Sequence, residues 1–363
     1  MFKELSLKHS FLIISVLLIV LISGCNVVKT DKKTPTLLKT ENAEQSVLMA
    51  EINRFASVNS LRAKMDLKFE DNSFAQFGSK EVYRSADGEV TVMRPANIFL
   101  KVQVPVIKTD VAQMSSDGTH FQVAILQDGG SGRYKKFVTG TNDADYTPLQ
   151  RQLSSGGEPN ANGEIRENVN AFANLRPQHF TDAMLMKPTN ADDVYTQSTI
   201  FQIEEDLTAP KKSPLRTVLR GYYLLDEFRK QGNGSLKITR RFWFDRVGGI
   251  RLARQQIFDA AGEIESDIVY GRQGALSDQP QYRNLPLEIV VTRPQEKYSM
   301  KLTYQMPSAV VIGRTYPEKG FILKNSWRLE VLDLDDKLKE IGASPSASSP
   351  TVPASKTATS AQQ

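Results

Sequence analysis

The chain has very few of the side chains that carry out chemistry. Among its 363 residues there are one cysteine, Cys25, and three histidines. A single cysteine excludes an internal disulfide, a CxxC redox pair and a cysteine-based metal site. The histidines (His9, His120 and His179) are isolated from one another, and no phosphate-binding glycine motif or G-x-S-x-G nucleophile motif occurs. The sequence therefore predicts a protein that is not an enzyme and has no metal site.

The chain also lacks a concentrated charge of either sign. Its formal net charge is +5, and the basic residues are scattered in short clusters such as Lys211–Lys212 and Arg240–Arg241. Nucleic-acid binding needs a basic stripe or patch, so a nucleic-acid partner is not expected. We interpret the clusters as solvated surface, with attraction toward anionic lipid head groups as the alternative.

The one long hydrophobic run lies at the N-terminus. Residues 11–22 are apolar except for Ser15, they follow Lys3 and Lys8, and the tetrad Ile22-Ser23-Gly24-Cys25 comes next. This run is too short to cross a bilayer comfortably and is typical of a signal peptide, here residues 1–24. The tetrad resembles a bacterial lipobox, which implies cleavage before Cys25 and its lipidation with acyl chains such as palmitate. The alternative is a retained anchor helix with an incidental cysteine.

Lipidation would decide where the protein resides. Two or three acyl chains, each contributing about 0.8 kcal/mol per buried CH₂, would make membrane attachment effectively permanent. Asn26 follows the cysteine, in place of the aspartate that retains enterobacterial lipoproteins at the inner membrane. We therefore expect an outer-membrane anchor facing the periplasm, or the outer leaflet of the cell membrane if the source has one membrane.

Composition divides the mature chain into three parts. Residues 25–41 are polar and rich in lysine, and are predicted to be a lipidated tether. Residues 344–363 are almost entirely Ser, Ala, Thr and Pro, and the segment 341–363 is predicted to be disordered. Residues 42–340 remain as one folded domain.

Period-2 alternation in residues 88–125 predicts a series of strands with one apolar face. Val90 and Val92 alternate with polar neighbours, and Arg94 falls on the same face. A guanidinium on an apolar sheet face needs hydrogen-bonding partners. We therefore expect polar groups to cover Arg94.

The rest of the domain continues the strand pattern. Residues 61–69 alternate without a fault, and hairpin signals separate further strands up to residue 306, although Arg240 interrupts the apolar face of the strand at 235–245. Helical spacing predicts one helix after Asn42 as its cap, another at 165–175 and a third from Pro177. We expect an antiparallel meander of about eleven strands, with these helices as a lid over its apolar face.

These residues resemble a known family. The order Gly88, strand, Arg94–Pro95, strand, Pro105 and the turn Ser116-Asp117-Gly118 is similar to the periplasmic lipoprotein carriers of the LolA family. The resemblance implies a mainly β fold, in which a single-sheet incomplete antiparallel β-barrel encloses an apolar cavity for acyl chains and is capped by short helices. It also implies that the arginine of the Arg-Pro pair, here Arg94, holds the lid closed.

The chain departs from that family in several respects. LolA is soluble, whereas this chain has a lipobox, as has the related acceptor LolB. The folded body is about a hundred residues longer than the family's, with the excess placed around 129–163 and 187–214, and Ala96 is an extra residue after the Arg-Pro pair. LolB-like acceptors touch the membrane through an apolar loop residue, and Val106 and Ile107 occupy a comparable place. The alternative for this pair, which we favour, is a buried bend.

We therefore expect a membrane-anchored, monomeric protein that binds acyl chains of lipids or lipoproteins, in their transfer to or insertion into the outer membrane. A periplasmic carrier would be its partner, and a bound lipid would be its ligand in place of a cofactor. The alternative is an envelope regulatory or scaffold module that binds a protein partner through the same fold. The candidate cavity-lining residues are Met65, Leu67, Val90, Val92, Ile98, Leu100, Val102, Phe172, Phe180 and Met184.

Overall fold

A computed structural model describes residues 34–71, 81–82, 86–104, 108–127, 135–146, 148–149, 176–276, 282 and 284–343. These residues form two compact units. The smaller unit contains residues 34–38 and 203–219, and the larger contains the remainder. Cys25, Val106, Ile107, Phe172 and the helix predicted at 165–175 lie outside the described residues.

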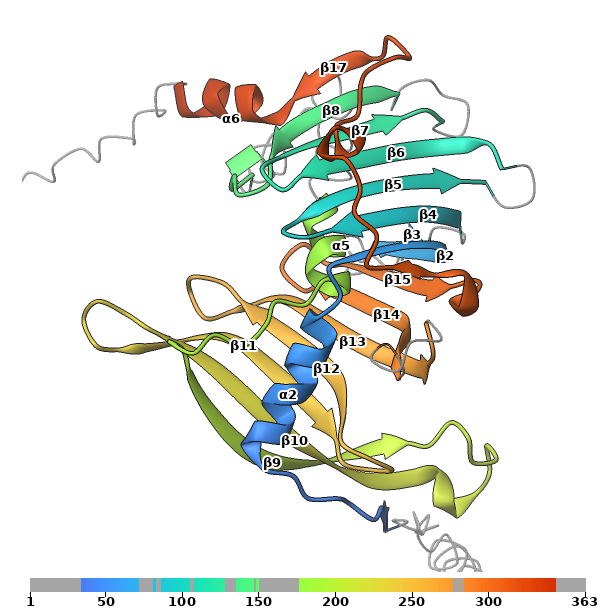
Figure 1. The fold of residues 1–363 in the computed structure, drawn as a ribbon, viewed down its shortest axis with the longest axis vertical. Helices are drawn as coiled ribbons and strands as arrows, with labels where there is room; N and C mark the ends of the chain where they lie inside the picture. The colour runs from blue at the N-terminus through green and yellow to red at the C-terminus, as the bar shows by residue number, and fades with distance from the viewer. Residues whose placement is uncertain are drawn as a thin grey trace, which may run out of the picture. The chain divides into compact units, whose positions relative to one another are not determined.

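The larger unit is built on one extended β-sheet (Figure 1). Its strands and the two that continue into the smaller unit are β2 (Ser60–Asp71), β3 (Glu81–Val82), β4 (Ala86–Met93), β5 (Asn97–Gln103), β6 (Asp110–Asp117), β7 (His120–Ile125), β8 (Lys136–Thr141), β9 (Val194–Glu205), β10 (Thr217–Lys230), β11 (Leu236–Asp245), β12 (Arg251–Phe258), β13 (Ile264–Gly274), β14 (Leu285–Arg293), β15 (Tyr298–Tyr304), β16 (Val311–Ile312) and β17 (Glu330–Asp333).

β2 lies in the middle of this sheet, hydrogen-bonded to β4 on one side and to β15 on the other. On one side of β2 the strands β4 to β8 follow in chain order, with β8 farthest from β2. On the other side the strands from β9 to β15 follow in chain order, and β15 lies next to β2. The pairings among β2, β4 to β8 and β10 to β15 are antiparallel, whereas β17 runs parallel to β8. In the described part of the chain β9 and β17 do not pair with each other, so the sheet is open.

The structure confirms a mainly β fold with an open sheet and helices. Among the described residues thirteen strands are six residues or longer, more than the eleven predicted. One of the strands that sequence analysis missed, β9, occupies the segment assigned to an insertion. Its apolar residues Phe201 and Ile203 are exposed, so β9 lacks the buried face that makes a strand recognisable in a sequence.

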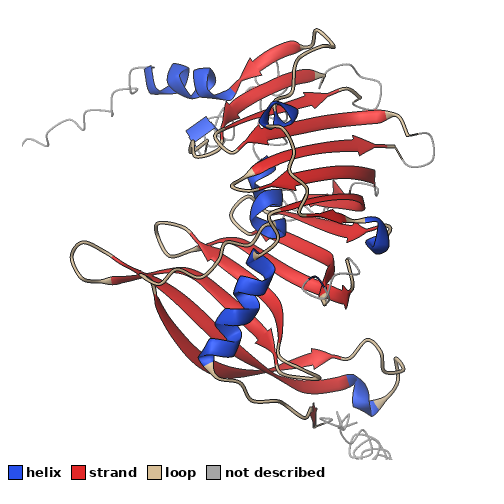
Figure 2. Ribbon diagram, viewed as in Figure 1, coloured by secondary structure: helices blue, strands red, loops and turns tan. Residues whose placement is uncertain are grey.

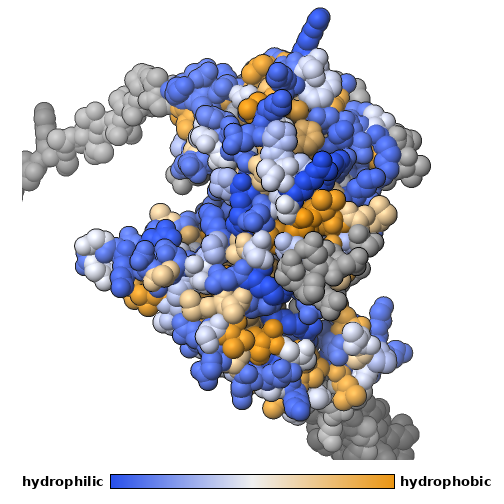
Figure 3. Space-filling model, viewed as in Figure 1, coloured by the Kyte–Doolittle hydropathy of each residue, from blue (hydrophilic) through white to orange (hydrophobic). Residues whose placement is uncertain are grey.

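Alternation explains which face of the sheet is buried. In β2 the side chains of Leu61, Met65 and Leu67 are at most 2% exposed, while Arg62 and Lys64 between them are exposed. Cross-strand register keeps this face continuous, because Leu67 lies opposite Leu302 of β15. On the face shown in Figure 3, polar side chains predominate and apolar ones form small separate patches.

Two helices cover the apolar face (Figure 2). Helix α2 (Gln45–Ala56) buries Leu48, Ile52 and Phe55, and the Phe55 ring lies 5.8 Å from the Tyr270 ring of β13. Helix α5 (Pro177–Met184) starts at Pro177, as predicted, and packs against β5, β6 and β14. Both helices bury an apolar stripe in the same core as the sheet.

The predicted cap of the first helix was wrong. Helix α2 is preceded by Glu44, which makes no side-chain cap, and not by Asn42. The Asn42 side-chain oxygen instead accepts hydrogen bonds from Arg246 and from the Tyr223 hydroxyl. These two donors from β10 and the end of β11 are distant in sequence, and local pattern therefore could not reveal the competition.

Two described elements reach beyond the predicted ends of the folded domain. Helix α6 (Leu334–Ala343) enters the segment 341–363 that was predicted to be disordered. In the predicted tether, β1 (Thr36–Leu37) pairs in parallel with Val218 and Leu219 inside the smaller unit. Short 3₁₀ helices occur at Pro214–Arg216, Pro307–Ala309 and Glu318–Phe321. No helix in the described ranges is both long and apolar enough to cross a membrane.

Packing around Gly140 of β8 allows a test of the core. A Cβ atom at this position would lie 2.6 Å from the Tyr146 hydroxyl oxygen and 2.7 Å from Phe121 Cζ, and both rings are fully buried. Gly140→Ala is therefore expected to lower the free energy of unfolding by about 1–3 kcal/mol, measured by urea titration. Gly232→Ala is the matched control, because no atom lies within 4 Å of its Cβ position. Equal stabilities of the two variants would contradict this packing.

Candidate functional site

Arg94 directly follows β4 and is fixed in place by its own backbone, whose N–H donates to the Asn59 carbonyl at 2.9 Å. It continues the face of Val90 and Val92, both of which are at most 1% exposed. The side chain itself is partly buried. The position expected from residue parity is therefore the observed one.

The Arg94 guanidinium donates to backbone carbonyls at the ends of both helices. Nη2 donates to Ala56, the last residue of α2, at 2.9 Å, and Nε donates to Val58 at 3.1 Å. Nη2 also donates to Met186 at 2.6 Å, and Nη1 to Leu185 at 3.5 Å, just after α5 ends. One side chain thus connects the C-terminal ends of α2 and α5 to the sheet.

Electrostatics favour this arrangement. The last carbonyls of a helix have no partner within the helix and carry the negative end of its dipole, so a cation there is stabilising. In the part of the chain that the structure describes, Arg94 pairs with no carboxylate. Burial lowers the pKa of Arg94 from its ordinary value, but a guanidinium still keeps its charge in a protein. The carbonyl oxygens replace the hydrogen bonds with water that the guanidinium loses on burial.

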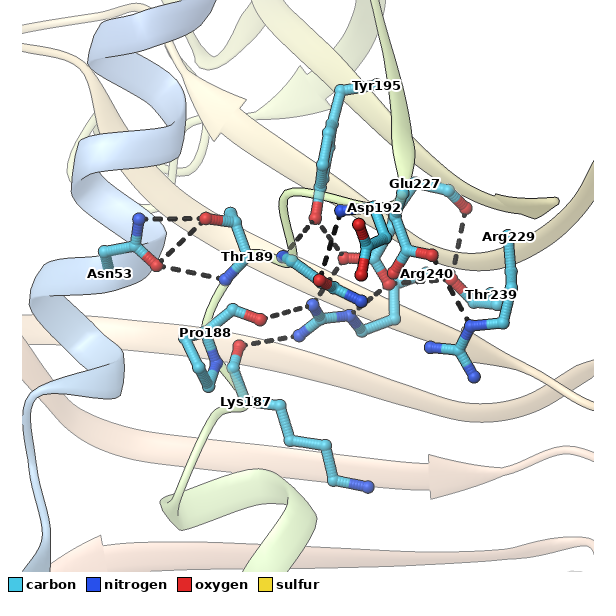
Figure 4. A network of polar contacts seen from close by, with 12 residues as sticks. Asn53, Lys187, Pro188, Thr189, Asp192, Tyr195, Glu227, Arg229, Thr239 and Arg240 are labelled. Carbon is cyan, nitrogen blue, oxygen red and sulfur yellow. Dashed lines mark hydrogen bonds and ion pairs between the residues drawn. The ribbon is translucent and has the colours of Figure 1, made fainter.

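A second arginine holds the next two carbonyls of the same segment (Figure 4). Arg240 of β11 donates from Nη1 to the Lys187 carbonyl at 2.7 Å and from Nη2 to the Pro188 carbonyl at 2.8 Å. Four consecutive carbonyls, those of residues 185–188, are therefore bound by two arginines from opposite sides of β2 in the sheet order.

Unlike Arg94, Arg240 has a buried carboxylate partner. Its Nε donates to Glu227 at 2.8 Å, and its Nη2 pairs with the second carboxylate oxygen. The Thr239 hydroxyl and the Tyr195 hydroxyl also donate to Glu227, at 2.7 and 2.8 Å. Glu227 is 1% exposed and Arg240 is 8% exposed, so the ion pair is almost completely shielded from solvent.

The pKa of Glu227 reflects this environment. Burial alone would raise the pKa of its carboxyl group, but the hydrogen bonds and charge of Arg240 outweigh burial and lower it below its ordinary value. The same contact, together with burial, raises the pKa of the Tyr195 hydroxyl to about 12. Glu227 is therefore ionised and Tyr195 protonated at neutral pH.

Residue parity predicts the inward position of Arg94, and the same signal is present at Arg240, which was not predicted as a site residue. Arg240 lies on the apolar face of its strand with Ile238 and Phe242, and we treated it as an imperfection in the pattern. Glu227 lies opposite Arg240 in the register of β10 and β11. An arginine on an apolar face with a glutamate across the hairpin is the signal that could have found the pair.

The structure places the described cavity candidates in one cluster. All are buried, and they pack together with Leu48 and Ile52 of α2. They are Met65, Leu67, Val90, Val92, Ile98, Leu100, Val102, Phe180 and Met184. Phe172, Val106, Ile107 and Cys25 lie outside the described residues, so their roles stay predictions. No group of acidic, histidine or cysteine side chains in the described ranges could hold a metal ion.

Comparison with known proteins gives structural similarities only. No family model and no curated protein matches the chain. A LolA superfamily protein from Nitrosomonas europaea is similar over 78% of this chain and 99% of its own, with 12% identity and a TM-score of 0.36. A DUF1329 family protein from Desulfovibrio piger covers 76% and 95%, with 12% identity and a TM-score of 0.35.

A domain named for outer membrane lipoprotein sorting, from Vibrio parahaemolyticus, covers 76% of this chain and 94% of its own, with 10% identity and a TM-score of 0.36. Identities and TM-scores are low in all three cases. The function is therefore inferred from the contacts of the chain itself.

The buried pair provides a test of what holds the segment at 185–188. Arg240→Leu leaves the Glu227 carboxylate buried without its cation, and we expect the free energy of unfolding to fall by about 3–5 kcal/mol. Arg62→Leu is the matched control, because the Arg62–Glu89 pair is 50% and 34% exposed, and it should lose about 1 kcal/mol or less. Urea titration at pH 7 measures both losses. Similar losses would show that the buried pair contributes no more to the free energy of unfolding than the exposed pair.

The same variants predict a pH dependence. Because the pKa of Glu227 is lowered in the folded state, its contribution is complete above its unfolded value of about 4.3 and disappears as pH falls through the folded value. In Arg240→Leu the same carboxyl group is buried without its cation, so its pKa is raised and protonation relieves its burial penalty. The stability difference between wild type and Arg240→Leu should therefore shrink progressively as the pH is lowered from 7 through about 4. A difference that stays constant there would contradict the assignment.

Proposed function

We propose that this protein is a lipid-anchored envelope protein that takes an acyl chain of a lipid or lipoprotein between its open sheet and helices α2 and α5. The observation that carries the proposal is the set of bonds from Arg94 to the ends of both helices, on the apolar face of the sheet. A small set of bonds from one side chain to both helix ends can hold a cover closed and still release it.

The two helices that form the cover, α2 and α5, turn apolar side chains toward the sheet. Leu48, Ile52 and Phe55 of α2 and Phe180 of α5 are buried against the sheet face formed by the cavity candidates. If the helices move away, this face becomes a continuous apolar surface that a hydrocarbon chain can contact. An acyl chain can then replace the helix side chains as the partner of the same strands.

The energies of the two states are similar in size. Burying a sixteen-carbon chain contributes about 12 kcal/mol at about 0.8 kcal/mol per CH₂. Uncovering the three apolar side chains of α2 costs about 5–9 kcal/mol at about 1.5–3 kcal/mol each, and uncovering Phe180 of α5 adds about as much as one of them. The bonds of Arg94 add about 1–3 kcal/mol to the closed state. The net affinity for a chain is then small enough to permit release, as transfer requires.

Residues outside the described ranges complete the proposal. The lipobox-like tetrad would make Cys25 the anchor, and Asn26, the second residue of the mature chain, favours the outer membrane facing the periplasm. In this position the protein would act as a monomeric acceptor that receives lipid or lipoprotein cargo from a periplasmic carrier. Val106 and Ile107 would contact the membrane if they are exposed.

The latch is tested by Arg94→Leu. Leucine suits the apolar face but cannot donate to the four carbonyls, so the closed empty state loses stability relative to the open loaded state. We expect bound lipid to be retained about tenfold more strongly or better, since about 1.4 kcal/mol corresponds to a factor of ten. Native mass spectrometry of the purified protein would show whether lipid co-purifies, and transfer of a fluorescent acyl lipid to acceptor vesicles would measure its release.

Arg62→Leu again serves as the matched control, because its ion pair with Glu89 lies on the wet face of the sheet. It should bind and release lipid as the wild type does. If Arg94→Leu also leaves uptake and release unchanged, Arg94 is not a latch. If no lipid co-purifies with either the wild type or Arg94→Leu, the acyl-chain function itself is wrong.

Cys25→Ser tests the anchor. The membrane-bound wild-type protein is expected to have the intact mass of residues 25–363 plus a diacylglyceryl group and an amide-linked acyl chain. The serine variant cannot form the thioether and should lack these groups in intact-mass measurements. A wild-type chain that begins at Met1 and carries no acyl group would support the retained anchor helix instead.

A further inference from the structure

The smaller unit carries the most exposed apolar side chains of the described chain. Four large hydrophobic side chains in the described ranges are 60–75% exposed, more than any other, and all four belong to this unit. They are Leu37, Ile203, Leu207 and Leu215. Apolar residues scattered singly over a surface are normal, whereas a group of them marks an interaction surface. The acyl-chain binding proposed above does not use this group.

Hydrogen bonding brings two of these side chains to the end of the β9–β10 hairpin. The Asp206 backbone N–H donates to the Arg216 carbonyl at 2.7 Å and closes the loop between the two strands. Leu207 and Leu215 are the first residues inside this closing bond, one on each side. Ile203 precedes the loop, near the end of β9.

The loop is fixed by its own polar groups. The Asp206 carboxylate accepts from the Thr208 N–H at 2.9 Å and from the Thr208 hydroxyl at 2.7 Å. Arg216 pairs with Glu205 and donates from Nη1 to the Ala209 carbonyl at 2.9 Å. The loop therefore displays its exposed leucines on a backbone whose shape is set before any partner binds, which lowers the entropy lost on binding.

The part of the loop inside the closing bond is positively charged. From Leu207 to Leu215 it has two charged residues, Lys211 and Lys212, and both are exposed. In the described part of the chain no carboxylate pairs with either lysine. Exposed leucines beside lysines are typical of a segment that lies at the interface of an anionic membrane.

The N-terminal segment joins the same unit. Strand β1 pairs in parallel with Val218 and Leu219, which follow the loop directly. The Leu38 N–H donates to the Leu219 carbonyl at 3.1 Å and extends this pairing. Leu37, the most exposed residue of β1 with a large apolar side chain, therefore lies beside the base of the loop.

The anchor proposed above would keep this unit close to a membrane. Cys25 is nine residues before Thr34, where the described chain begins, and nine residues reach at most about 30 Å in any conformation. A tether of this length gives the unit a high effective concentration at the lipid surface, so a weak second contact is sufficient. The membrane is therefore the partner that the exposed leucines and lysines fit.

We propose that the smaller unit docks onto an anionic lipid surface. Leu207 and Leu215 enter the boundary between head groups and acyl chains, and Lys211 and Lys212 contact the anionic head groups. This inference rests on the membrane attachment of the proposed function but not on acyl-chain binding. It places the membrane contact in a different loop from the one at 106–107.

A probe on the loop tests the docking. Leu207→Cys is labelled with a thiol-reactive fluorophore that senses its environment, and the protein with its own anchor is placed in vesicles of phosphatidylcholine and phosphatidylglycerol. We expect a blue-shifted emission and quenching by lipids with brominated acyl chains, at a depth of about 5–10 Å. Leu236→Cys is the matched control, because Leu236 is also exposed beside a hairpin loop but belongs to the larger unit. Its probe should stay in water.

Intact mass separates failure of this inference from failure of the proposed anchor. Cys25 is the only native cysteine, so an acylated Leu207→Cys chain takes one label. A second label would show that the lipidation is wrong. The probe is then placed in a Cys25→Ser chain, which keeps the N-terminal hydrophobic run as its anchor. The emission of the probe at 207 decides the docking in both cases.

The charge is tested by Lys211→Gln combined with Lys212→Gln. The ratio of docked to undocked protein should fall about 30-fold, because both lysines are attracted by the anionic surface. Vesicles of phosphatidylcholine alone should have a similar effect, and added salt should weaken docking. Lys230→Gln combined with Lys237→Gln, at the β10–β11 hairpin, is the matched control and should dock as the wild type does.

Three results would overturn the inference. The probe at 207 could stay in water on anionic vesicles, the probe at 236 could enter the bilayer equally, or docking could be insensitive to both the lysines and the anionic lipid. A blue shift that grows with protein density and is not quenched by brominated chains would also overturn it. That result would show that a second copy of the chain covers the loop.

Discussion

A guanidinium on an apolar sheet face must replace the hydrogen bonds that it had with water, and this constraint organises the larger unit. In this protein the replacement comes from backbone carbonyls at the ends of two helices and in the segments just beyond them. Arg94 takes those at the ends of α2 and α5, and Arg240 takes the next two along the chain. The guanidinium donors satisfy the carbonyls, and the carbonyls satisfy the guanidinium groups. The arginines can therefore be buried only while the helices stay in this position.

The two arginines differ in a way that bears on function. Arg240 is fixed by a buried carboxylate with four donors around it, and removing it would leave an uncompensated charge. Arg94 contacts only neutral carbonyls, which can be satisfied by water when the helices move. Arg240 therefore suits a permanent attachment of residues 187–188, and Arg94 suits a reversible attachment of the two helix ends. This difference is what one expects of a hinge next to a latch.

Much of the fold could be predicted because period-2 alternation is a local property. The strands from β10 to β15 follow the runs that the sequence marks, and Pro177 marks the start of α5. Where alternation carried no burial signal, as in β9, the prediction failed. The cap at Asn42 failed for a different reason, since Arg246 and Tyr223 compete for its side chain from distant strands.

The sequence by itself determined the class of the fold, the apolar face and the inward position of Arg94, because each depends only on the spacing of neighbouring residues. Only the tertiary structure decided which groups meet that arginine, and that Arg240 and Glu227 form a buried pair. These contacts join residues from separate strands and helices. Their energies depend on distance and burial, which residue order does not specify.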